Sequence, residues 1–310
     1  MIGKQTQQPL PPKPKEQMPH VKLNMTYKEW MHRHEGRHKW RNRRWTVLVF
    51  INLLFVISFS FDLAVLEGSL NGSRLIGFYL MDPYVSLELA SISIRTHYWP
   101  HVTMNMIIGL ITILTFYLLM GGRTFCSWVC PYHFLAEWAE KLHKYLVKKR
   151  KIKEHHFNRG LRYVFWVGFL ILALVTKRLI FQEINPVGIV SRALIYGPGL
   201  ILLWILALIT FEIVYSQRFW CRYVCPIGTT WSFVGKLSPV TIKFEYEKCG
   251  HCRKCQDVCL VPHVLWFVVK GRATQAQHYV GSDCIKCGYC VDICPGDALN
   301  FSIKGLSKIV

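Results

Sequence analysis

Residues 249–259 read Cys-Gly-His-Cys-Arg-Lys-Cys-Gln-Asp-Val-Cys, and residues 284–295 read Cys-Ile-Lys-Cys-Gly-Tyr-Cys-Val-Asp-Ile-Cys-Pro. Both stretches have the C-x-x-C-x-x-C-x-x-x-C spacing that holds 4Fe-4S clusters in bacterial ferredoxins. Three thiolates from one tight loop bind three irons, and the fourth cysteine of each motif ligates the other cluster. The spacing therefore predicts two clusters, one on Cys249, Cys252, Cys255 and Cys294 and the other on Cys284, Cys287, Cys290 and Cys259.

The segments that flank these motifs have the alternating pattern of β-strands. Residues 241–246 and 298–303 could pair at the edge of a two-cluster, ferredoxin-like α+β domain, which we assign to residues 236–310. Structural zinc is the competing interpretation, but zinc usually takes two separated cysteine pairs instead of a packed triple with a fourth. The sequence departs from the ferredoxin pattern at Leu260, which stands where a proline would follow Cys259.

The remainder of the chain is rich in apolar stretches. Of its 310 residues, 52% are hydrophobic and only 18% are charged, against about 25% charged in soluble domains. This composition argues against an ordinary soluble protein. A membrane-spanning helix needs about 20 mainly apolar residues, and four stretches predict transmembrane helices: residues 45–66, 99–120, 161–181 and 199–215. We therefore expect a membrane α-helical domain of four transmembrane helices over residues 45–235.

The distribution of charge predicts how these helices are oriented. The formal net charge is +20, and basic residues are concentrated in residues 28–44 and 121–159, whereas residues 67–98 are nearly balanced. Short loops rich in Lys and Arg stay in the cytoplasm. Both termini are therefore expected on the cytoplasmic side of a bacterial inner membrane, with a disordered, basic segment over residues 1–44. The charge indicates contact with anionic lipid, and no nucleic-acid partner is expected.

One block of the sequence occurs twice. Residues 121–131 read Gly-Gly-Arg-Thr-Phe-Cys-Ser-Trp-Val-Cys-Pro, and residues 216–226 read Ser-Gln-Arg-Phe-Trp-Cys-Arg-Tyr-Val-Cys-Pro. An axis along the membrane normal that relates two such copies would bring their C-x-x-x-C-P pairs together. The four sulfurs could then hold a third cluster on Cys126, Cys130, Cys221 and Cys225. Arg123 and Arg218 would favour the thiolate form of these cysteines.

Two other interpretations of the C-x-x-x-C-P pairs stay open. The cysteines could be small buried side chains, or they could form a disulfide, which the cytosol disfavours. All twelve cysteines of the chain fall within the four motifs. A redox role for the pairs is therefore favoured.

Two helices are expected outside the four spans. The stretch after the first cysteine pair has Phe134, Trp138, Leu142 and Tyr145 at helical spacing, with lysines on its other faces. It could lie in the membrane interface or pack on the C-terminal domain. The connection over residues 70–97 is expected to hold a short re-entrant or interfacial helix.

Histidines test for haem and indicate a quinol site. The chain has no C-x-x-C-H motif, and only His97 and His101 lie at a predicted span, so bis-histidine haem within the membrane is not expected. A quinol headgroup needs a proton acceptor, which makes these two histidines candidates for a quinol site with Arg95 or Glu183 nearby. The alternative is that they are interfacial side chains beside Trp99.

The same residues resemble a known family. The predicted spans, the paired C-x-x-x-C-P motifs, Glu-Ile-Asn-Pro-Val at 183–187 followed by Ser-Arg at 191–192, and the double 4Fe-4S motif look like NapH, with NosH and MauN among its relatives. The resemblance covers residues 45–301 and implies a quinol dehydrogenase that oxidises menaquinol or ubiquinol. It also implies a periplasmic iron–sulfur partner of the NapG type and, beyond it, a multihaem cytochrome or a reductase such as nitrate reductase. It marks all twelve cysteines and assigns no quinol site.

The resemblance leaves one physical difficulty and two other classes of function. The charge pattern places the ferredoxin-like domain inside, whereas the implied partner lies outside, across about 30 Å of hydrocarbon. An assembly or maturation factor for a periplasmic metalloenzyme or quinone-cofactor enzyme is the first alternative. A passive anchor is the second, although eight cysteines at cluster spacing would be superfluous there. Quinol-dependent reduction of the clusters separates the first interpretation from both.

Overall fold

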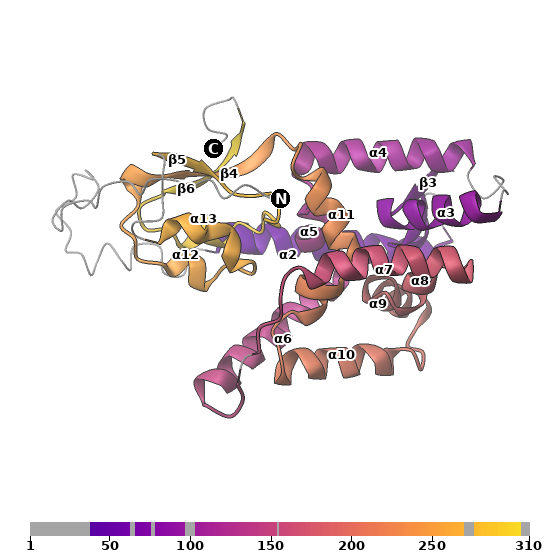
Figure 1. Cartoon of the computed structure of the whole chain (residues 1–310), viewed down its shortest axis with the longest axis horizontal. Coiled ribbons are helices and arrows are strands. Elements are labelled where there is room, and N and C mark those ends of the chain that lie inside the picture. The colour runs from indigo at the N-terminus through magenta and orange to yellow at the C-terminus, as the bar shows by residue number, and fades with distance from the viewer. Residues whose placement is uncertain are drawn as a thin grey trace.

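The computed structural model of the chain describes residues 38–62, 66–75, 78–96, 103–153, 155–269 and 276–304. A helical part and a smaller unit with its own sheet lie along the long axis of the molecule (Figure 1). The helical part contains α2 (Lys39–Ser60), α3 (Pro83–Thr96), α4 (Met104–Met120), α5 (Thr124–Trp128), α6 (Pro131–Lys148), α7 (Leu161–Thr176), α8 (Ile180–Ile184), α9 (Pro186–Tyr196), α10 (Leu202–Val214), the π-helix η2 (Trp220–Val224) and α11 (Pro226–Val234).

One of the four predicted transmembrane segments forms a helix of full spanning length. Among the described residues, α2 is the helix long and apolar enough to cross a membrane, whereas α4, α7 and α10 are apolar helices of 17, 16 and 13 residues. The third predicted segment ends early, because Lys177 adopts a left-handed conformation (φ 58°) that terminates α7. The start of the 99–120 segment and residues 1–37 lie outside the described residues.

Helices α3 and α9 are re-entrant: their first turns are buried in the helical part and their last residues are exposed. A helix within residues 70–97 is thus present as α3, and its re-entrant or interfacial position in a membrane stays a prediction. Each helix starts with an Asx-Pro pair. The side chain of Asp82 accepts a hydrogen bond from the backbone N–H of Tyr84 (2.8 Å), and that of Asn185 accepts one from Val187 (3.1 Å). These bonds satisfy N–H groups that every helix start leaves without an intrahelical partner.

The helical part consists of two interlocked copies of one unit. Elements α2 to α6 form the first copy, and α7, α9, α10, η2 and α11 form the second. The first long helix of each copy packs on the re-entrant helix of the other, α2 on α9 and α7 on α3. The helix after each C-x-x-x-C-P motif packs on the last long helix of the other copy, α6 on α10 and α11 on α4. This reciprocal packing is the pattern that a twofold relation between the copies produces.

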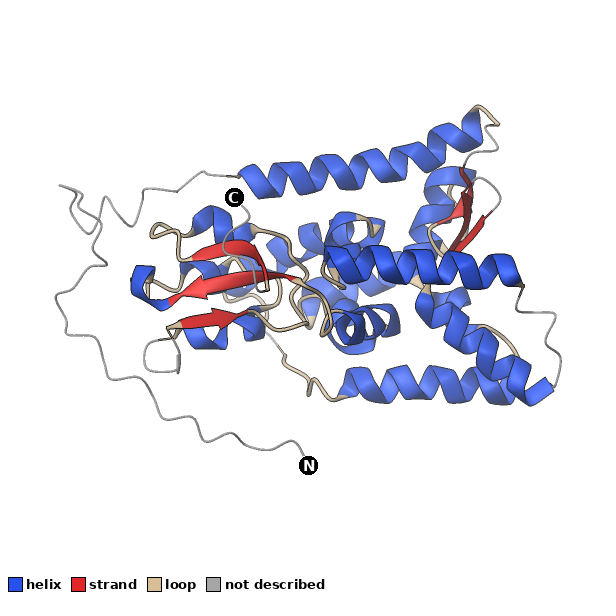
Figure 2. Cartoon of the chain, turned by 90° about the horizontal axis from the view of Figure 1, so that it is seen from above, coloured by secondary structure: helices blue, strands red, loops and turns tan. Residues whose placement is uncertain are grey.

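A small antiparallel sheet at the far end of the helical part was not predicted. Strands β1 (Leu66–Ser69), β2 (Gly72–Leu75) and β3 (Phe78–Met81) form it in the order β1-β2-β3, and it lies at the opposite end from the second sheet (Figure 2). We call this end the outer end. Strand β3 packs on α4 at Gly109, where an added Cβ would lie 1.8 Å from the carbonyl oxygen of Tyr79. Only glycine permits this close approach.

Gly109→Ala is therefore expected to destabilise the protein. Forcing the backbone of β3 away from α4 should cost about 1–3 kcal/mol or more, as in other overpacked sites. The measurement is the thermal unfolding midpoint of the detergent-solubilised protein. Gly168→Ala on α7 is the matched control, because an added Cβ there meets no atom within 4 Å. Equal midpoints for the two variants would contradict the packing of β3 on α4.

The smaller unit has the two-strand pairing that the sequence predicts. It contains β4 (Val240–Glu245), η3 (Tyr246–Lys248), α12 (Lys254–Asp257), η4 (Pro262–Val268), β5 (Gln277–Tyr279), α13 (Tyr289–Ile293) and β6 (Leu299–Ile303). Strand β4 pairs with β6 in antiparallel fashion, with Ile242 opposite Phe301, which confirms the predicted pairing. Strand β5 adds a third, unpredicted strand on the other edge of β4. We call this part the ferredoxin unit.

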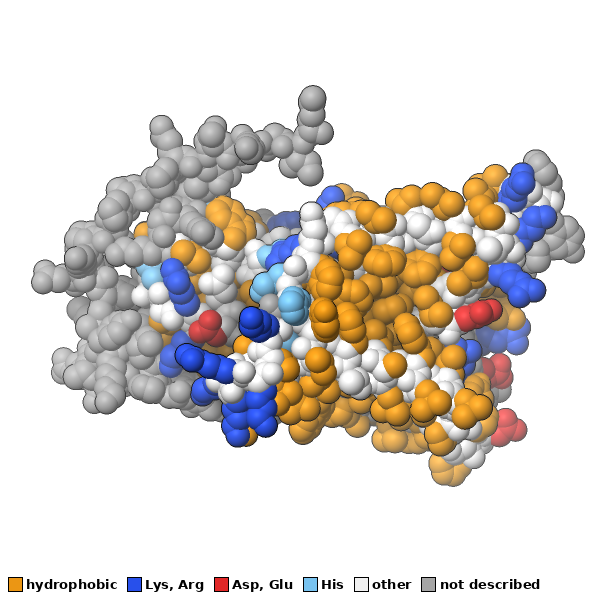
Figure 3. Space-filling view, turned by 60° about the horizontal axis from the view of Figure 1, so that its bottom comes forward, with side chains coloured by type: hydrophobic (Ala, Val, Ile, Leu, Met, Phe, Trp, Pro, Cys, Tyr) orange, Lys and Arg blue, Asp and Glu red, His pale blue; other side chains and the backbone are white. Residues whose placement is uncertain are grey.

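The surface of the helical part is apolar. On the face that Figure 3 shows, a broad hydrophobic area lies over the helical part, with Lys and Arg side chains gathered toward both of its ends. Helix α6 has an inverted arrangement, because its exposed face carries Trp138 and Leu142 whereas Glu137, Glu140 and His143 are buried against the protein. Such a helix exposes its apolar face to its surroundings, which favours the membrane-interface interpretation of this segment.

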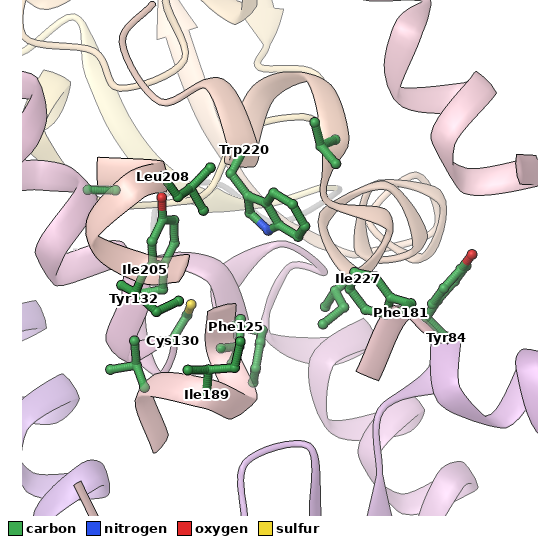
Figure 4. Close-up of a cluster of buried hydrophobic side chains, with 14 of the residues drawn as sticks. Tyr84, Phe125, Cys130, Tyr132, Phe181, Ile189, Ile205, Leu208, Trp220 and Ile227 are labelled. Carbon is green, nitrogen blue, oxygen red and sulfur yellow. The ribbon is translucent and has the colours of Figure 1, made fainter. Parts of the chain in front are cut away.

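The core of the helical part surrounds the C-x-x-x-C-P segments. Cys130 lies among Tyr132, Phe125 and Ile189, side chains that come from both copies (Figure 4). Near the start of α3, the ring of Tyr84 packs on Phe181, with 5.4 Å between the ring centroids. The cysteines are therefore fixed within a close-packed interior.

Candidate iron–sulfur sites

The four C-x-x-x-C-P cysteines line one cavity between the two copies. We call it the tetracysteine cavity, and its cysteines are Cys126, Cys130, Cys221 and Cys225. Pro131 and Pro226 each begin a helix, so the cysteine before each proline is a cap with a non-helical backbone (ψ 115° at Cys130 and 109° at Cys225). The second cysteine of each pair is thereby turned out of the helix.

Arginines surround the tetracysteine cavity. Its walls include Arg123, Arg159, Arg162, Arg218 and Arg222. Burial raises the pKa of the Cys126 thiol, and Arg123 acts in the opposite sense. Burial also raises the pKa of the Cys221 thiol well above its ordinary value, and Arg218 lowers it. The arginines favour thiolate as the sequence predicts, but burial has the larger effect on the pKa of both thiols and favours the neutral form.

The eight remaining cysteines line two further cavities. Ferredoxin site 1 is lined by Cys249, Cys252, Cys255 and Cys294. Ferredoxin site 2 is lined by Cys259, Cys284, Cys287 and Cys290. Each cavity therefore combines three cysteines of one motif with the last cysteine of the other.

The loops of the two ferredoxin motifs have the same backbone. Residues at equivalent positions have positive φ: His251 and Arg253 in the first loop (56° and 60°), and Lys286 and Gly288 in the second (51° and 78°). This turn aims backbone N–H groups at sulfur. His251 N–H donates to Sγ of Cys249 and Lys286 N–H to Sγ of Cys284, both at 3.4 Å. Such hydrogen bonds stabilise negative charge on a ligating sulfur.

The tetracysteine cavity and ferredoxin site 2 share a wall. Val261 and Ile285 line both cavities. The first C-x-x-x-C-P segment is also bonded to the second cysteine loop: Ser127 Oγ donates to the carbonyl of Ile285 (2.5 Å), and Trp128 Nε1 donates to that of Lys286 (3.1 Å). The three cysteine sets therefore form a row that begins in the helical part and ends at ferredoxin site 1.

The spacing of these cysteines is not that of a single metal ion. Four thiolates around one zinc ion lie about 3.8 Å apart, given a Zn–S bond near 2.3 Å. Within the described ranges, no three His, Cys, Asp or Glu side chains come together in a way that could hold one ion. Four thiols around each cavity, with N–H groups aimed at sulfur, fit a larger group such as a 4Fe-4S cluster.

The predicted quinol residues are only partly described. His97 and His101 lie outside the described residues, whereas Arg95 and Glu183 are exposed side chains. Sequence reasoning missed two buried carboxyls, Asp82 immediately before α3 and Glu88 within it. The signal for Asp82 is its Asp-Pro pair, which corresponds to Asn185-Pro186 in the second copy.

Comparisons with known proteins agree with this geometry. One family profile described as "4Fe-4S binding domain" matches residues 102–153 and 196–245, one match in each copy. A second profile of the same description matches residues 279–300. The chain is 32% identical to "Ferredoxin-type protein NapH" of Escherichia coli K12, over 86% of this chain and 91% of that protein. It is 30% identical to the protein of the same name from Haemophilus influenzae, over 87% and 94%.

A third relative is the "Methylamine utilization ferredoxin-type protein MauN" of Paracoccus denitrificans, 31% identical over 68% of this chain and 72% of that protein. No solved structure matches. Fold and site together define an iron–sulfur electron-transfer protein of the ferredoxin type. Within that class, the chain belongs to the family of NapH and MauN ferredoxin-type proteins.

Proposed function

We propose that the protein is the membrane-bound iron–sulfur subunit of a quinol dehydrogenase, which takes electrons from menaquinol or ubiquinol. The observation that carries this proposal is the wall shared by the tetracysteine cavity and ferredoxin site 2. A row of three redox centres that begins among apolar helices is suited to a reductant dissolved in the membrane. Membership of the NapH and MauN family supports the same function.

Each of the three cysteine sets would hold one 4Fe-4S cluster, and haem is not part of the proposal. A bound cluster supplies a centre that gains and loses one electron at a time. The chain fixes the positions of the ligands, excludes water, and aims N–H groups at sulfur, which favours the reduced and more negative state. Arg123 and Arg218 add positive charge at the first centre of the row.

We further propose four membrane-crossing segments in a bacterial inner membrane, with both termini in the cytoplasm. The proposed divisions are a basic N-terminal segment (1–44), a membrane domain (45–235) and a ferredoxin domain (236–310). The apolar side chains exposed on α4, α7 and α10 and the inverted face of α6 support contact with lipid. Helices α4, α7 and α10 are short for a membrane crossing. Because α3 and α9 also extend into the helical part, the thickness of the membrane domain does not depend on these three helices alone.

The partners are proposed from the resemblance alone. A periplasmic iron–sulfur protein of the NapG type would receive the electrons and pass them to a multihaem cytochrome or a reductase. His97 and His101 stay the sequence-based proposal for a proton-accepting group near the outer end. Supply of reducing equivalents for assembly of a periplasmic metalloenzyme is the alternative.

The test is reduction of the clusters by quinol in isolated membranes. A short-chain menaquinol analogue should reduce the iron–sulfur centres within the turnover time of the respiratory chain. Electron paramagnetic resonance under anaerobic conditions measures this reduction. Dithionite gives the total that can be reduced and serves as the reference. Clusters that dithionite reduces but quinol does not would overturn the quinol dehydrogenase assignment in favour of assembly or anchoring.

A further inference from the structure

Two buried carboxyl side chains, one at the start of α3 and one within it, have no cation beside them in the described part of the chain. The exposed fractions of Asp82 and Glu88 are 8% and 0%, and neither joins an ion pair within the part of the chain that the structure describes. Gln182 is the polar side chain that faces Glu88, and neither carboxylate oxygen of Glu88 accepts a hydrogen bond of good geometry. Buried carboxyls without full partners are costly, and at membrane depth such groups tend to be functional.

The internal duplication shows that the carboxyl of Asp82 is not needed for the fold. Asn185 occupies the corresponding cap of α9 and accepts the same hydrogen bond from the residue two positions later. An amide oxygen therefore caps a re-entrant helix of this unit as well as a carboxylate does. Position 82 nevertheless carries an ionisable carboxyl where the second copy has the amide of Asn185. Capping of the helix does not explain this difference.

The two carboxyls lie between the tetracysteine cavity and the outer end. Asp82 is close enough to Cys126 and Cys225 to contribute to the raised pKa of both thiols. Glu88 lies about 9 Å further along α3, at 1.5 Å per residue. The helix continues to Thr96 at its exposed end, and the next residue in the chain is His97. Helix α3 thus connects the cysteines with the surface.

Both carboxyls can change their protonation state near neutral pH. Burial raises the pKa of Asp82 to about 7, and the N–H of Tyr84 acts in the opposite sense. Burial also raises the pKa of Glu88 to about 7, where Gln182 lowers it and Asp82 raises it. The other titratable groups that interact with this pair are Tyr84, Tyr117, Cys126 and Cys225. All of these are acids, so within the described ranges no basic side chain fixes the carboxyls in their charged form.

Resting on the quinol oxidation proposed above, we infer that the quinol is oxidised at the tetracysteine cavity instead of at His97 and His101. Asp82 and Glu88 then form a proton relay, which carries the protons of the quinol to the outer end. Oxidation of one quinol to quinone breaks two O–H bonds and releases two electrons and two protons. The electrons leave one at a time for the iron–sulfur centres held by the cysteine row. Each proton passes to the carboxylate of Asp82, then to that of Glu88, and then to solvent at the outer end, which restores both carboxylates for the next proton.

The test compares Asp82→Asn and Glu88→Gln with wild-type protein in membranes. Asp82→Asn copies the cap of the second copy, and Glu88→Gln keeps the size of the side chain. Each should lower the rate of quinol-driven cluster reduction by about 10²-fold, the usual contribution of a positioned proton acceptor. Iron content and reduction by dithionite should not change. Glu67→Gln, at an exposed carboxyl of the outer-end sheet, is the matched control and should react at the wild-type rate.

The pH profile provides a second measurement. The acceptor must be a carboxylate, so the wild-type rate should rise as pH rises through about 7. The profile of Glu88→Gln should lose this rise. If the pH profile of Glu88→Gln has the same shape as that of the wild type, the rise comes from the quinol and not from the carboxylates. That result would overturn the relay.

A third measurement does not depend on activity. Dicyclohexylcarbodiimide modifies protonated carboxyls in apolar surroundings, and mass spectrometry of peptides locates the product. Glu88 should be modified increasingly as pH falls through about 7, and the exposed Glu183 should not. Two results would overturn the relay alone. One is an equal rate of quinol-driven cluster reduction in wild type and in a variant that combines Asp82→Asn with Glu88→Gln, and the other is no modification of Glu88. Failure of quinol to reduce the wild type would overturn the proposed function and the relay with it.

Discussion

Replacing both Cys126 and Cys221 by serine is expected to lower the iron content of anaerobically purified protein from about twelve to about eight per chain, if all three centres are cubanes. The two residues come from different copies of the duplicated unit and line the same cavity. Removing one ligand from each side leaves two thiols, which cannot hold a four-iron cluster in place. Quinol-driven reduction of the remaining eight irons should become undetectable, because the first centre of the row is lost.

Cys252→Ser is the control that separates iron content from electron entry. Cys252 belongs to ferredoxin site 1, at the far end of the row from the tetracysteine cavity. Its loss should also remove about four irons, yet quinol should still reduce the remaining eight. An iron content that stays at about eight in wild type and in the serine double variant would show that the tetracysteine cavity holds no cluster. Electrons would then have to enter at ferredoxin site 2.

The cysteine sets were predictable because short-range spacing determines them. A C-x-x-C-x-x-C loop presents three sulfurs to one centre whatever surrounds it, and the crossed fourth cysteine follows from two such loops in one small domain. The pairing of β4 with β6 was readable for a similar reason, since alternation over five or six residues is a local property. These features depend little on the rest of the chain.

The helical part was predicted less completely because its decisive contacts are long-range. Hydropathy identifies apolar segments but not where a helix starts or turns back, so α3 and α9 were not recognised as an equivalent pair. The Asx-Pro pairs at Asp82 and Asn185 carry that signal. Helical periodicity in α6 likewise defined two faces, but the sequence did not show that Glu137 and Glu140 face the protein, since buried charges are rare without partners. Their partners, Arg44 and Arg218, come from distant segments.

Arg44→Met is expected to lower the free energy of unfolding by about 3–5 kcal/mol, the usual cost of breaking a buried ion pair from one side. Arg44 is fully buried, and its guanidinium contacts His133 Nε2 (2.8 Å), Glu137 Oε2 (2.5 Å) and the hydroxyl of Tyr289 (2.7 Å). His133 and Glu137 lie on α6, and Tyr289 begins α13 in the ferredoxin unit. Methionine would fill much of the space but remove the closest cation of Glu137, which would keep the more distant, half-exposed ammonium of Lys141 at 3.8 Å. Arg43→Met, one residue away on an exposed position, is the control and should cost less than about 1 kcal/mol.

The double variant Arg44→Met with Glu137→Gln distinguishes the charge from the packing. Burial raises the pKa of Glu137, but Arg44 and the hydrogen bond from Tyr289 lower it more, so the net pKa lies below 4.5. In the wild type, the stability that this carboxylate contributes is present above about pH 4.5 and is lost as pH falls below it. Arg44 makes the largest lowering contribution to the folded-state pKa of Glu137. That pKa therefore rises without Arg44, and the deficit of Arg44→Met should grow as pH rises from about 4 to 7. Removing the carboxylate should recover part of the loss at pH 7 and little at pH 4, as measured by a double-mutant cycle on unfolding midpoints.

A deficit independent of pH, which Glu137→Gln does not relieve, would mean that Arg44 holds α2 on the ferredoxin unit through packing and hydrogen bonds to neutral groups instead of through its charge.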